Sequence, residues 1–523
     1  MSQEASGLKE DRKKVLKRAF FMASGTLASR ILGLFRDIAL GALFDRTVTD
    51  AWTAAFRIPN LFRRLLGEGS LSVSFIPVFM EAQEADPRGV RARNLANGLY
   101  TLLLIFLGVL TLLGLIFTED LFRLILAQNF TSLHEKWELT VRMGRIMFGF
   151  VFFVCTYAYF MGILNALGSF GLPALAPALL NVAMLIFTFL PPQWFPQPGD
   201  GLAWGVLIGG FLQALLVWLA LRSRGYLPRW QGSVLSADVK QVLRNMLPGL
   251  IGMGLLQFST LVNLYFASSL PEGSISYIYW ADRLLELPLS LISVSIGAAL
   301  LPTLSSLAAV RSFEKFRETS RENFLVNLFL AWPAALGLFF LAEPIVEVLF
   351  LRGKFTHQDL LATAAVLKVY AVSLVFISCS RVLMPLYYAV KNTWFPAVVS
   401  LLCLAMHISV APFLMREYGL VGLTYSGLLA AFLNMTILFL SLFHWRISFV
   451  SASFFKSLIK MIIAGAGLAA VLLLARPWFA EMARGLQMLA LFATIAAGVI
   501  VYFALAALLR SEEFSRIRPS FRL

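Results

Sequence analysis

Long apolar stretches recur from one end of this chain to the other, and they restrict its fold more than any other feature. Hydrophobic residues make up 59% of the 523 residues and charged residues only 14%, against about 25% charged in soluble domains. A helix needs roughly 20 apolar residues to cross a hydrocarbon layer about 30 Å thick. We therefore predict an all-α polytopic membrane protein with about 14 transmembrane helices. Their expected limits are residues 17–45, 51–84, 95–118, 139–166, 172–194, 200–224, 241–270, 276–306, 321–344, 360–388, 393–415, 420–446, 455–476 and 485–510.

Lysines and arginines gather in alternate loops between these stretches. The basic clusters fall within residues 9–18, 88–93, 222–244, 311–321, 446–456 and 510–522. The intervening loops 191–201 and 268–274 contain no basic residue. By the positive-inside rule both termini are cytoplasmic, which requires an even number of spans. The net charge of +15 thus has a topological explanation, and we expect no nucleic acid as a partner.

Two pairs of matching segments indicate an internal duplication. Arg57 corresponds to Arg283 and Pro77 to Pro302, at offsets of 226 and 225 residues. The segments that enter the fifth and eleventh spans match at an offset of 223. A repeated unit of six spans keeps its orientation, so two six-helix lobes in a parallel pseudo-repeat are expected, related by an axis along the membrane normal.

The predicted organisation has five parts. They are a basic cytoplasmic N-terminus at 1–16, an N-terminal six-helix lobe at 17–225, a C-terminal six-helix lobe at 240–447, two extra transmembrane helices at 455–510 and a cytoplasmic tail at 511–523.

The motifs of common cofactor and metal sites are missing. The segment 352–355 (RGKF) lacks the leading glycine and the Ser or Thr of a phosphate-binding loop. The apparent dinucleotide fingerprint at 465–470 lies inside an apolar span, where small residues permit close helix contact. The three cysteines are isolated within spans, and the four histidines are scattered. We expect no cofactor, metal or catalytic residue, and a carrier or channel rather than an enzyme; an intramembrane enzyme stays open as an alternative.

Charged residues occur inside three of the predicted spans. These are Arg30, Arg36 and Asp37 in the first span, Arg57, Arg63, Arg64 and Glu68 in the second, and Asp282, Arg283 and Glu286 in the eighth. A charge at the bilayer centre costs at least about 2.5 kcal/mol, so such residues face a bundle interior or a watery cavity. One interpretation is that they pair with one another, as Arg30 with Asp37 or Arg64 with Glu68. Six arginines against four carboxylates leave positive charge over, which favours an anionic substrate with phosphate oxygens.

The second span is too long for one regular helix. A straight helix would place Arg57, Asn60, Arg64 and Glu68 on one stripe and Arg63 elsewhere. The span would be roughly 50 Å long, and it contains two prolines and a Gly-Glu-Gly at 67–69. We predict a break near residues 67–69.

Four segments together resemble one known family. SRILGLFRD (29–37), DAWTAAFRIPNLFRRLLGEGSLSVSFIPVF (50–79), WADRLLELP (280–288) and LFLRGKFT (349–356) closely resemble the MurJ (MviN) family of lipid II flippases. That family belongs to the multidrug/oligosaccharidyl-lipid/polysaccharide exporter superfamily, and the similarity runs through the whole chain. It implies alternating-access transport of lipid II, an undecaprenyl pyrophosphate with a disaccharide-pentapeptide, between the leaflets of the bacterial cytoplasmic membrane for cell-wall synthesis. Membrane lipids and other cell-wall synthesis proteins are further expected partners.

The resemblance also implies site residues. The substrate-binding set is Arg30, Arg36, Arg57, Asn60, Arg63 and Arg283; the supporting and gate set is Asp37, Asp50, Glu68, Asp282 and Glu286. Asp37 would orient Arg36, Glu68 would lie near the periplasmic gate, and the two extra helices would hold the prenyl tail in an apolar groove. The family motif selects Arg63 for the cavity whereas a straight helix selects Arg64, a conflict that a bend at Pro59 would resolve.

Other functions remain as alternatives. An exporter of another polyprenyl-linked glycan would need the same arginines, whereas an exporter of amphipathic cations would show acidic cavity residues. A scaffold that recruits cell-wall enzymes would tolerate loss of Arg36 or Arg283. Spans 241–270 and 393–415 contain no Asp or Glu, which argues against a carboxylate-based sodium site there.

Overall fold

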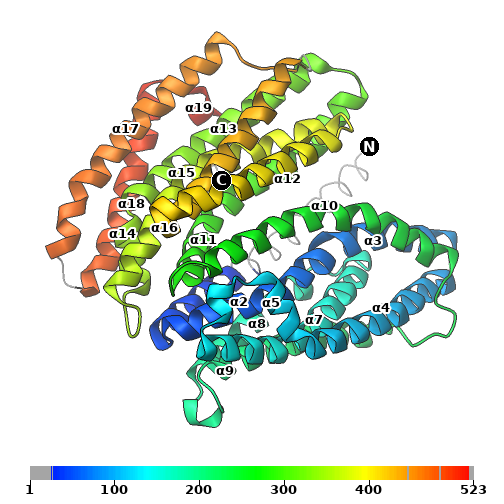
Figure 1. The fold of residues 1–523 in the computed structure, drawn as a ribbon. Helices are drawn as coiled ribbons and strands as arrows, with labels where there is room; N and C mark the ends of the chain where they lie inside the picture. The colour runs from blue at the N-terminus through cyan, green and yellow to red at the C-terminus, as the bar shows by residue number, and fades with distance from the viewer. Residues whose placement is uncertain (1–24, 26–27, 87, 445–446, 482–483, 518–523) are drawn as a thin grey trace. The chain divides into compact units, whose positions relative to one another are not determined.

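Helices are the regular elements throughout the part of the chain that the structure describes (Figure 1). This computed structural model describes residue 25 and residues 28–86, 88–444, 447–481 and 484–517. By length and composition alone, ten of the described helices could cross a membrane, which agrees with the predicted class of all-α polytopic membrane protein. The main helices are α2 (Arg46–Phe62), α3 (Leu71–Ala85), α4 (Val90–Ile116), α7 (His134–Ala166), α8 (Gly171–Phe189), α9 (Asp200–Ser223), α10 (Ala237–Ser268), α11 (Ser274–Leu289), α12 (Ser295–Ala309), α13 (Phe313–Phe340), α15 (His357–Ala389), α16 (Trp394–His444), α17 (Ala452–Glu481) and α18 (Arg484–Leu508). Shorter helices are α5 (Thr118–Ile125), α6 (Gln128–Thr131), α14 (Ala342–Phe350) and α19 (Glu512–Ile517), and residues 192–194 form a single 3-10 turn.

The ten helices cover eleven of the fourteen predicted spans, because one helix covers two of them. Helix α16 covers both 393–415 and 420–446, and a break at Gly419 (φ 56°, ψ −129°) divides it. Span 51–84 is divided among α2, a π-helical segment and α3. Span 241–270 corresponds to α10, and span 17–45 falls partly outside the described residues, which are helical over 28–43. The number 14 therefore stays a prediction.

The predicted break in the second span is a π-helical segment, η1 (Arg63–Ser70). Helix α2 continues through Pro59 to Phe62, so the helical register changes at η1 and not at the proline. A second π-helical segment, η3 (Ser290–Val294), lies between α11 and α12. Shifted by the predicted offset of 226 residues, η1 would cover 289–296, which contains η3. The two segments thus occupy corresponding positions, as a duplicated chain would place them.

The chain packs as two compact units, residues 1–275 and 276–523. In the first unit, α7 packs against α2, α3, α4 and α9, and α10 lies along α3 and η1 (Figure 1). The sequence predicts most of α10 to belong to the lobe at 240–447, but in the structure α10 packs with the first unit. The limits of the packing units therefore differ from the predicted lobe limits, and the lobes themselves stay a prediction.

A stripe of glycines joins α8 to α9. Gly201, Gly205 and Gly209 follow one another at intervals of four residues, so they share a face of α9. A Cβ atom on each of them would lie 2.9 Å from a backbone atom of α8. In chain order these atoms are the Phe187 carbonyl oxygen, the Met184 Cα and the Leu180 Cα. Small residues at this spacing let two helix backbones approach closely inside a membrane. The stripe fixes α8 at one distance from α9.

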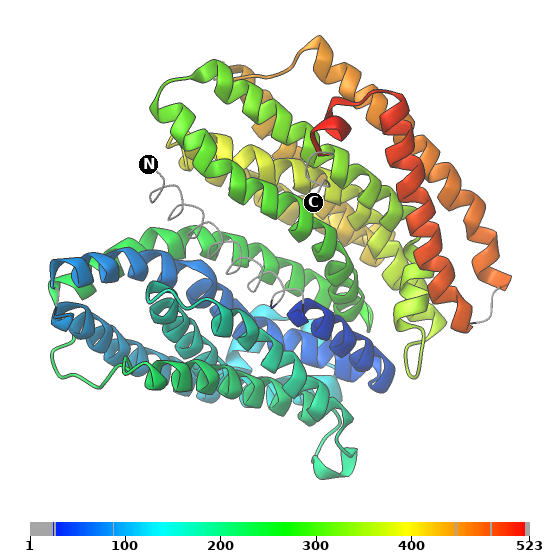
Figure 2. The same cartoon turned by 180° about the vertical axis from the view of Figure 1, so that it is seen from behind.

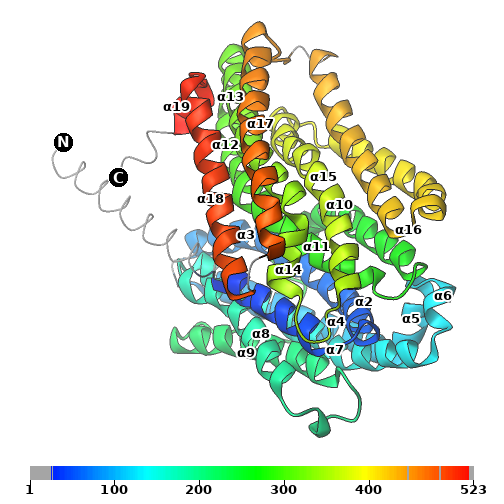
Figure 3. The same cartoon turned by 90° about the vertical axis from the view of Figure 1, so that its left-hand side faces the viewer.

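The second unit is built around α13 and α15. Helix α17 runs alongside α13 (Figure 3), and α17 and α18 lie side by side at the edge of this unit (Figure 2). The buried hydroxyl of Tyr502 in α18 donates to the Phe329 carbonyl of α13 over 2.9 Å. Glu343 of α14 accepts from Lys368 of α15 over 2.5 Å and from Arg476 of α17 over 3.0 Å. The two extra C-terminal helices are therefore attached to the second unit by apolar packing and by ion pairs at one end.

Alanine substitutions in the glycine stripe test this account of the α8–α9 contact. Gly205→Ala and Gly209→Ala each raise helix propensity, but their methyl groups overlap the α8 backbone, which costs about 1–3 kcal/mol. We expect both variants to lower the melting temperature of the purified protein. Gly108→Ala in α4 is the matched control, because nothing lies within 4 Å of its Cβ position. A stripe variant as stable as the control would contradict close packing here.

Candidate functional site

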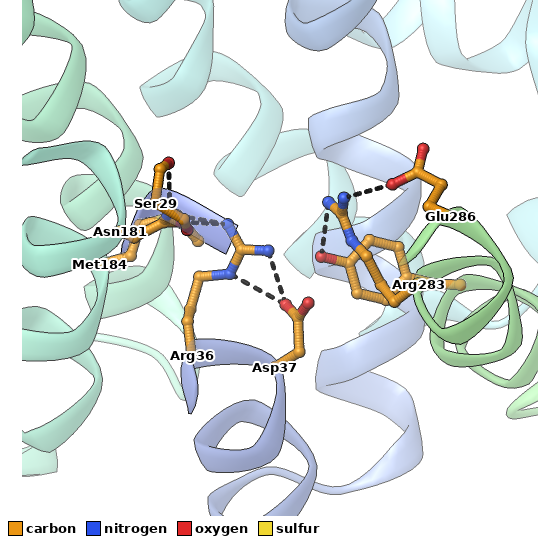
Figure 4. A network of polar contacts seen from close by, with 8 residues as sticks. Ser29, Arg36, Asp37, Asn181, Met184, Arg283 and Glu286 are labelled. Atoms are coloured by element: carbon orange, nitrogen blue, oxygen red, sulfur yellow. Dashed lines mark hydrogen bonds and ion pairs between the residues drawn. The ribbon is translucent and has the colours of Figure 1, made fainter. Parts of the chain in front are cut away.

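Arg36 lies inside the first unit in a cluster of polar side chains that are hydrogen-bonded to one another (Figure 4). Its Nε and Nη2 donate to Asp37 Oδ1 over 2.9 and 2.7 Å, and its Nη1 donates to Asn181 Oδ1 over 2.8 Å. The side chains of Arg36 and Asp37 are only 6% and 2% exposed. A buried guanidinium is tolerated when a carboxylate and further acceptors surround it. Asp37 therefore orients Arg36 as expected, and together they form a buried ion pair.

Asn181 of α8 is the residue of this cluster that sequence reasoning missed. Its Nδ2 donates to the Ser29 carbonyl over 2.8 Å, while its Oδ1 accepts from Arg36. Gly33 lies between these contacts, and a Cβ there would be 3.6 Å from the Asn181 amide. Ser29, Gly33 and Arg36 thus form the face of the first helix that meets α8. The sequence did contain a sign of this contact, because Asn181 is a carboxamide in an otherwise apolar span. Polar side chains in such spans form hydrogen bonds to neighbouring helices.

The charged residues of the second span lie around the start of η1. Arg63 Nε donates to Asn60 Oδ1 over 2.8 Å, so the asparagine orients this guanidinium. Arg57, Asn60, Arg63 and Arg64 are all partly exposed, as is Arg30 in the first helix. The side chain of Glu68 lies outside the described residues, so its gate role is untested. Both Arg63 and Arg64 keep access to solvent or substrate, and the choice between them stays open.

Arg283 of α11 is held by two residues of its own helix (Figure 4). Its Nη1 donates to Glu286 Oε2 over 3.1 Å, and its Nη2 donates to the Tyr279 hydroxyl over 3.2 Å. The guanidinium carbon lies 4.9 Å from the centre of the Tyr279 ring. The side chains of Arg283 and Glu286 are 32% and 48% exposed, and Asp282 is partly exposed. An exposed pair of this kind is worth under about 1 kcal/mol, so an incoming anion can displace the glutamate.

Asp50 does not line an open surface; it anchors a loop. Its carboxylate is 1% exposed and accepts from Lys136 Nζ of α7 over 2.6 Å. The same Oδ2 atom accepts from the Gly273 amide over 2.8 Å. Ser268 Oγ accepts from the Ala127 amide over 2.8 Å. The loop between α10 and α11 is therefore attached to α2 through Asp50, and the end of α10 is attached to the segment between α5 and α6. These contacts give Asp50 a positioning role.

Arg381 in α15 is a further intramembrane cation that the sequence analysis overlooked. It lies in α15, a helix that could cross a membrane, eight residues before the helix ends at Ala389, and it is exposed. A Cβ on Gly297 of α12 would lie 2.9 Å from the Arg381 carbonyl oxygen, so the two helices touch at this level. Within the described part of the chain no carboxylate forms an ion pair with it. An exposed arginine at this depth is expected to face water or an anion, because lipid tails do not solvate it.

The arrangement suits electrostatic binding better than covalent chemistry. Several partly exposed guanidinium groups occur in spanning helices of both units, and arginine forks pair well with phosphate oxygens. No group of three His, Cys, Asp or Glu residues in the described ranges could hold a metal ion. The site residues can bind and release an anion through hydrogen bonds alone.

Breaking the buried pair tests whether it holds the first helix. Asp37→Asn leaves the Arg36 guanidinium buried without its carboxylate, which costs about 3–5 kcal/mol. We expect a large fall in the melting temperature of the purified protein. Glu119→Gln is the control, because it removes the carboxylate of an exposed pair with Arg123 (63% and 40% exposed), worth under about 1 kcal/mol. Equal stability of the two variants would show that the buried pair contributes nothing.

The sequence of this chain matches a family model and several curated proteins. The family model described as "Lipid II flippase MurJ" matches residues 40–495. A probable lipid II flippase MurJ of Bdellovibrio bacteriovorus is 70% identical over 520 residues, covering 99% of this chain and 99% of that relative. The lipid II flippase MurJ of Burkholderia cenocepacia is 34% identical over 82% of this chain and 84% of its own length.

Comparisons of structure give the fold. A solved lipid II flippase MurJ in an inward closed conformation matches with a TM-score of 0.76 at 24% identity, over 96% of this chain and all of that one. An inward-facing multidrug resistance MATE family transporter of the MOP superfamily matches with a TM-score of 0.68 at 18% identity, over 82% and 98%. Because the family model spans residues 40–495 and one relative shares 70% of its residues over nearly its whole length, the chain belongs to the MurJ family of lipid II flippases.

Proposed function

We propose that this chain moves lipid II from the inner to the outer leaflet of the bacterial cytoplasmic membrane for cell-wall synthesis. Membership of the family supports the proposal, and so does the chemistry of the substrate, which carries a pyrophosphate. The observation that carries it is the excess of arginine over carboxylate inside the first, second and eighth predicted spans. Fixed cations at this depth lower the cost of taking a pyrophosphate out of water.

Arg283 and Arg63 are the proposed direct contacts. Each guanidinium is pre-oriented by a neighbour, Arg283 by Tyr279 and Arg63 by Asn60. Orientation before binding reduces the entropy lost when the phosphate is captured. Glu286 can move away from Arg283 as the phosphate arrives and return when it leaves, which makes release as easy as capture. Arg30 and Arg57 add partly exposed positive charge in the same spans.

Arg36 has a different proposed role in this conformation. Its donors are occupied by Asp37 and Asn181, and it is buried. It holds the first helix against α8 and thereby positions Arg30. A direct contact between Arg36 and the pyrophosphate would require the side chain to leave Asn181, and it stays a prediction from the family resemblance.

Transport needs no covalent step. The substrate enters and leaves chemically unchanged, so no catalytic residue is required. We propose that the prenyl tail stays in lipid along α17 and α18 while the head group crosses, with both termini in the cytoplasm. A charge crossing the membrane gains or loses about 2.3 kcal/mol per 100 mV. An outside-positive potential therefore favours outward movement of the pyrophosphate and opposes the return of an empty cationic site.

Substitution of Arg283 tests the proposed contact. Arg283→Ala should reduce the lipid II that becomes accessible in the outer leaflet at least tenfold, in cells depleted of their own flippase. Arg283→Lys should retain part of the activity, because lysine keeps the charge but loses the two-pronged fork. Arg123→Ala, at an exposed pair, is the control. A scaffold protein would leave Arg283→Ala cells growing normally, and a transferase would release a chemically altered lipid; either result would refute the proposal.

Arg381 extends the proposed path and can be tested separately. Arg381→Gln should raise the lipid II concentration needed for half-maximal transport in proteoliposomes several-fold, because one phosphate partner is lost. The exposed Arg416→Gln variant serves as the matched control in the same unit. If both variants transport like the wild type, Arg381 has no part in binding.

A further inference from the structure

A cavity of about 250 Å³ lies at one end of the first unit, away from the residues discussed above. Its walls are the first two turns of α4 and the segment 225–229 that follows α9. The polar side chains that line it are Arg93, Asn94, Asn97, Tyr226 and Arg229. Its rims belong to the clusters 88–93 and 222–244, which the charge pattern places on the cytoplasmic side.

The cavity has a fixed shape because the segment after α9 is fastened along α4. The Arg229 amide donates to Asn97 Oδ1 over 2.8 Å, and the Gln231 amide donates to Thr101 Oγ1 over 3.0 Å. Further along, Arg91 of α4 makes two hydrogen bonds of 2.9 and 2.6 Å to Asp238 at the start of α10. These contacts hold both walls without using the side chains of Arg93 or Arg229.

The cavity is cationic and rich in donors. The Arg93 guanidinium carbon lies 5.3 Å from the centre of the Tyr226 ring, and no described carboxylate pairs with Arg93 or Arg229. Tyr226 contributes its ring to the cavity wall, and its hydroxyl oxygen is buried. Two acids close in sequence to the cavity are engaged, Asp86 by the amides of Arg88 and Arg91 and Asp238 by the Arg91 side chain.

We propose that this cavity binds a phosphate group. Two guanidinium forks and two carboxamides around a pocket of this size match the oxygens of one phosphate ester. The ester can belong to an anionic membrane lipid or to a free solute. Trp230 and Val90 beside the cavity are 65% and 52% exposed, as expected where a basic cluster meets lipid at the membrane surface. The site goes beyond the proposed transport of lipid II and does not depend on it.

Equilibrium binding to the purified full-length chain in detergent tests the proposal. The probes are dioctanoyl-phosphatidylglycerol, inorganic phosphate and, as the zwitterionic comparison, dioctanoyl-phosphatidylcholine. The cavity variant is Arg93→Gln with Arg229→Gln. The matched control is Arg88→Gln with Arg224→Gln, which removes the same charge from two exposed arginines that do not line the cavity. Melting temperatures establish that each variant is folded.

We expect the cavity variant to bind phosphatidylglycerol at least tenfold more weakly and the control less than twofold more weakly. Asn94→Ala removes one carboxamide that lines the cavity and should weaken binding several-fold. As a single substitution it also checks that the loss of binding does not come from misfolding of the double variant. If inorganic phosphate binds with the same dependence on these residues, the phosphate alone is recognised; if only phosphatidylglycerol binds, the lipid is the ligand. Equal weakening in the cavity and control variants, or no binding of either anion, would overturn the proposal.

Discussion

A guanidinium buried among apolar helices has to be surrounded by hydrogen-bond acceptors. In the first unit, residues of the first helix and of α8 provide these acceptors for Arg36. Asp37 supplies the charge, Asn181 supplies a carboxamide from α8, and Gly33 leaves room for it. Helix α8 can present Asn181 at the right distance because the glycines of α9 fix its position. One buried cation thus links the first helix to α8.

The π-helical segments show how the same chain reconciles charge with a long membrane span. A regular α-helix would have placed Arg57 and Arg64 on one side and Arg63 on another. The wider turns of η1 change the register between the charged first half of the span and the apolar second half. Segment η3 follows α11 in the corresponding position after Arg283. Such segments are frequent at functional sites; here η1 begins at Arg63, and η3 begins seven residues after Arg283.

The sequence predicted what depends on hydropathy and local pattern. It predicted a helical membrane fold, a break near residues 67–69 and separate spans at 393–415 and 420–446, which Gly419 divides. The orientation of Arg36 by Asp37 was implied by the family resemblance. It could not predict contacts between residues far apart in the chain, so Asn181 and Lys136 were missed as partners of Arg36 and Asp50. Arg381 was missed for a different reason, because a single arginine in an apolar span carries no local motif. The packing of α10 with the first unit was also beyond a repeat-based division, since sequence similarity does not report which surface a helix buries.

The anchoring of Gly273 has a mechanical consequence. Its amide is fixed by Asp50, and α11 begins at the next residue. The first residue of α11 is therefore held close to the Asp50 carboxylate. Arg283 lies about 14 Å further along the helix at 1.5 Å per residue. A tilt of about 10° would displace that guanidinium by roughly 2 Å, enough to exchange one hydrogen-bond partner for another. If Arg283 binds the pyrophosphate as proposed, a small rotation of α11 about its first turn would change the hydrogen bonds that the substrate receives.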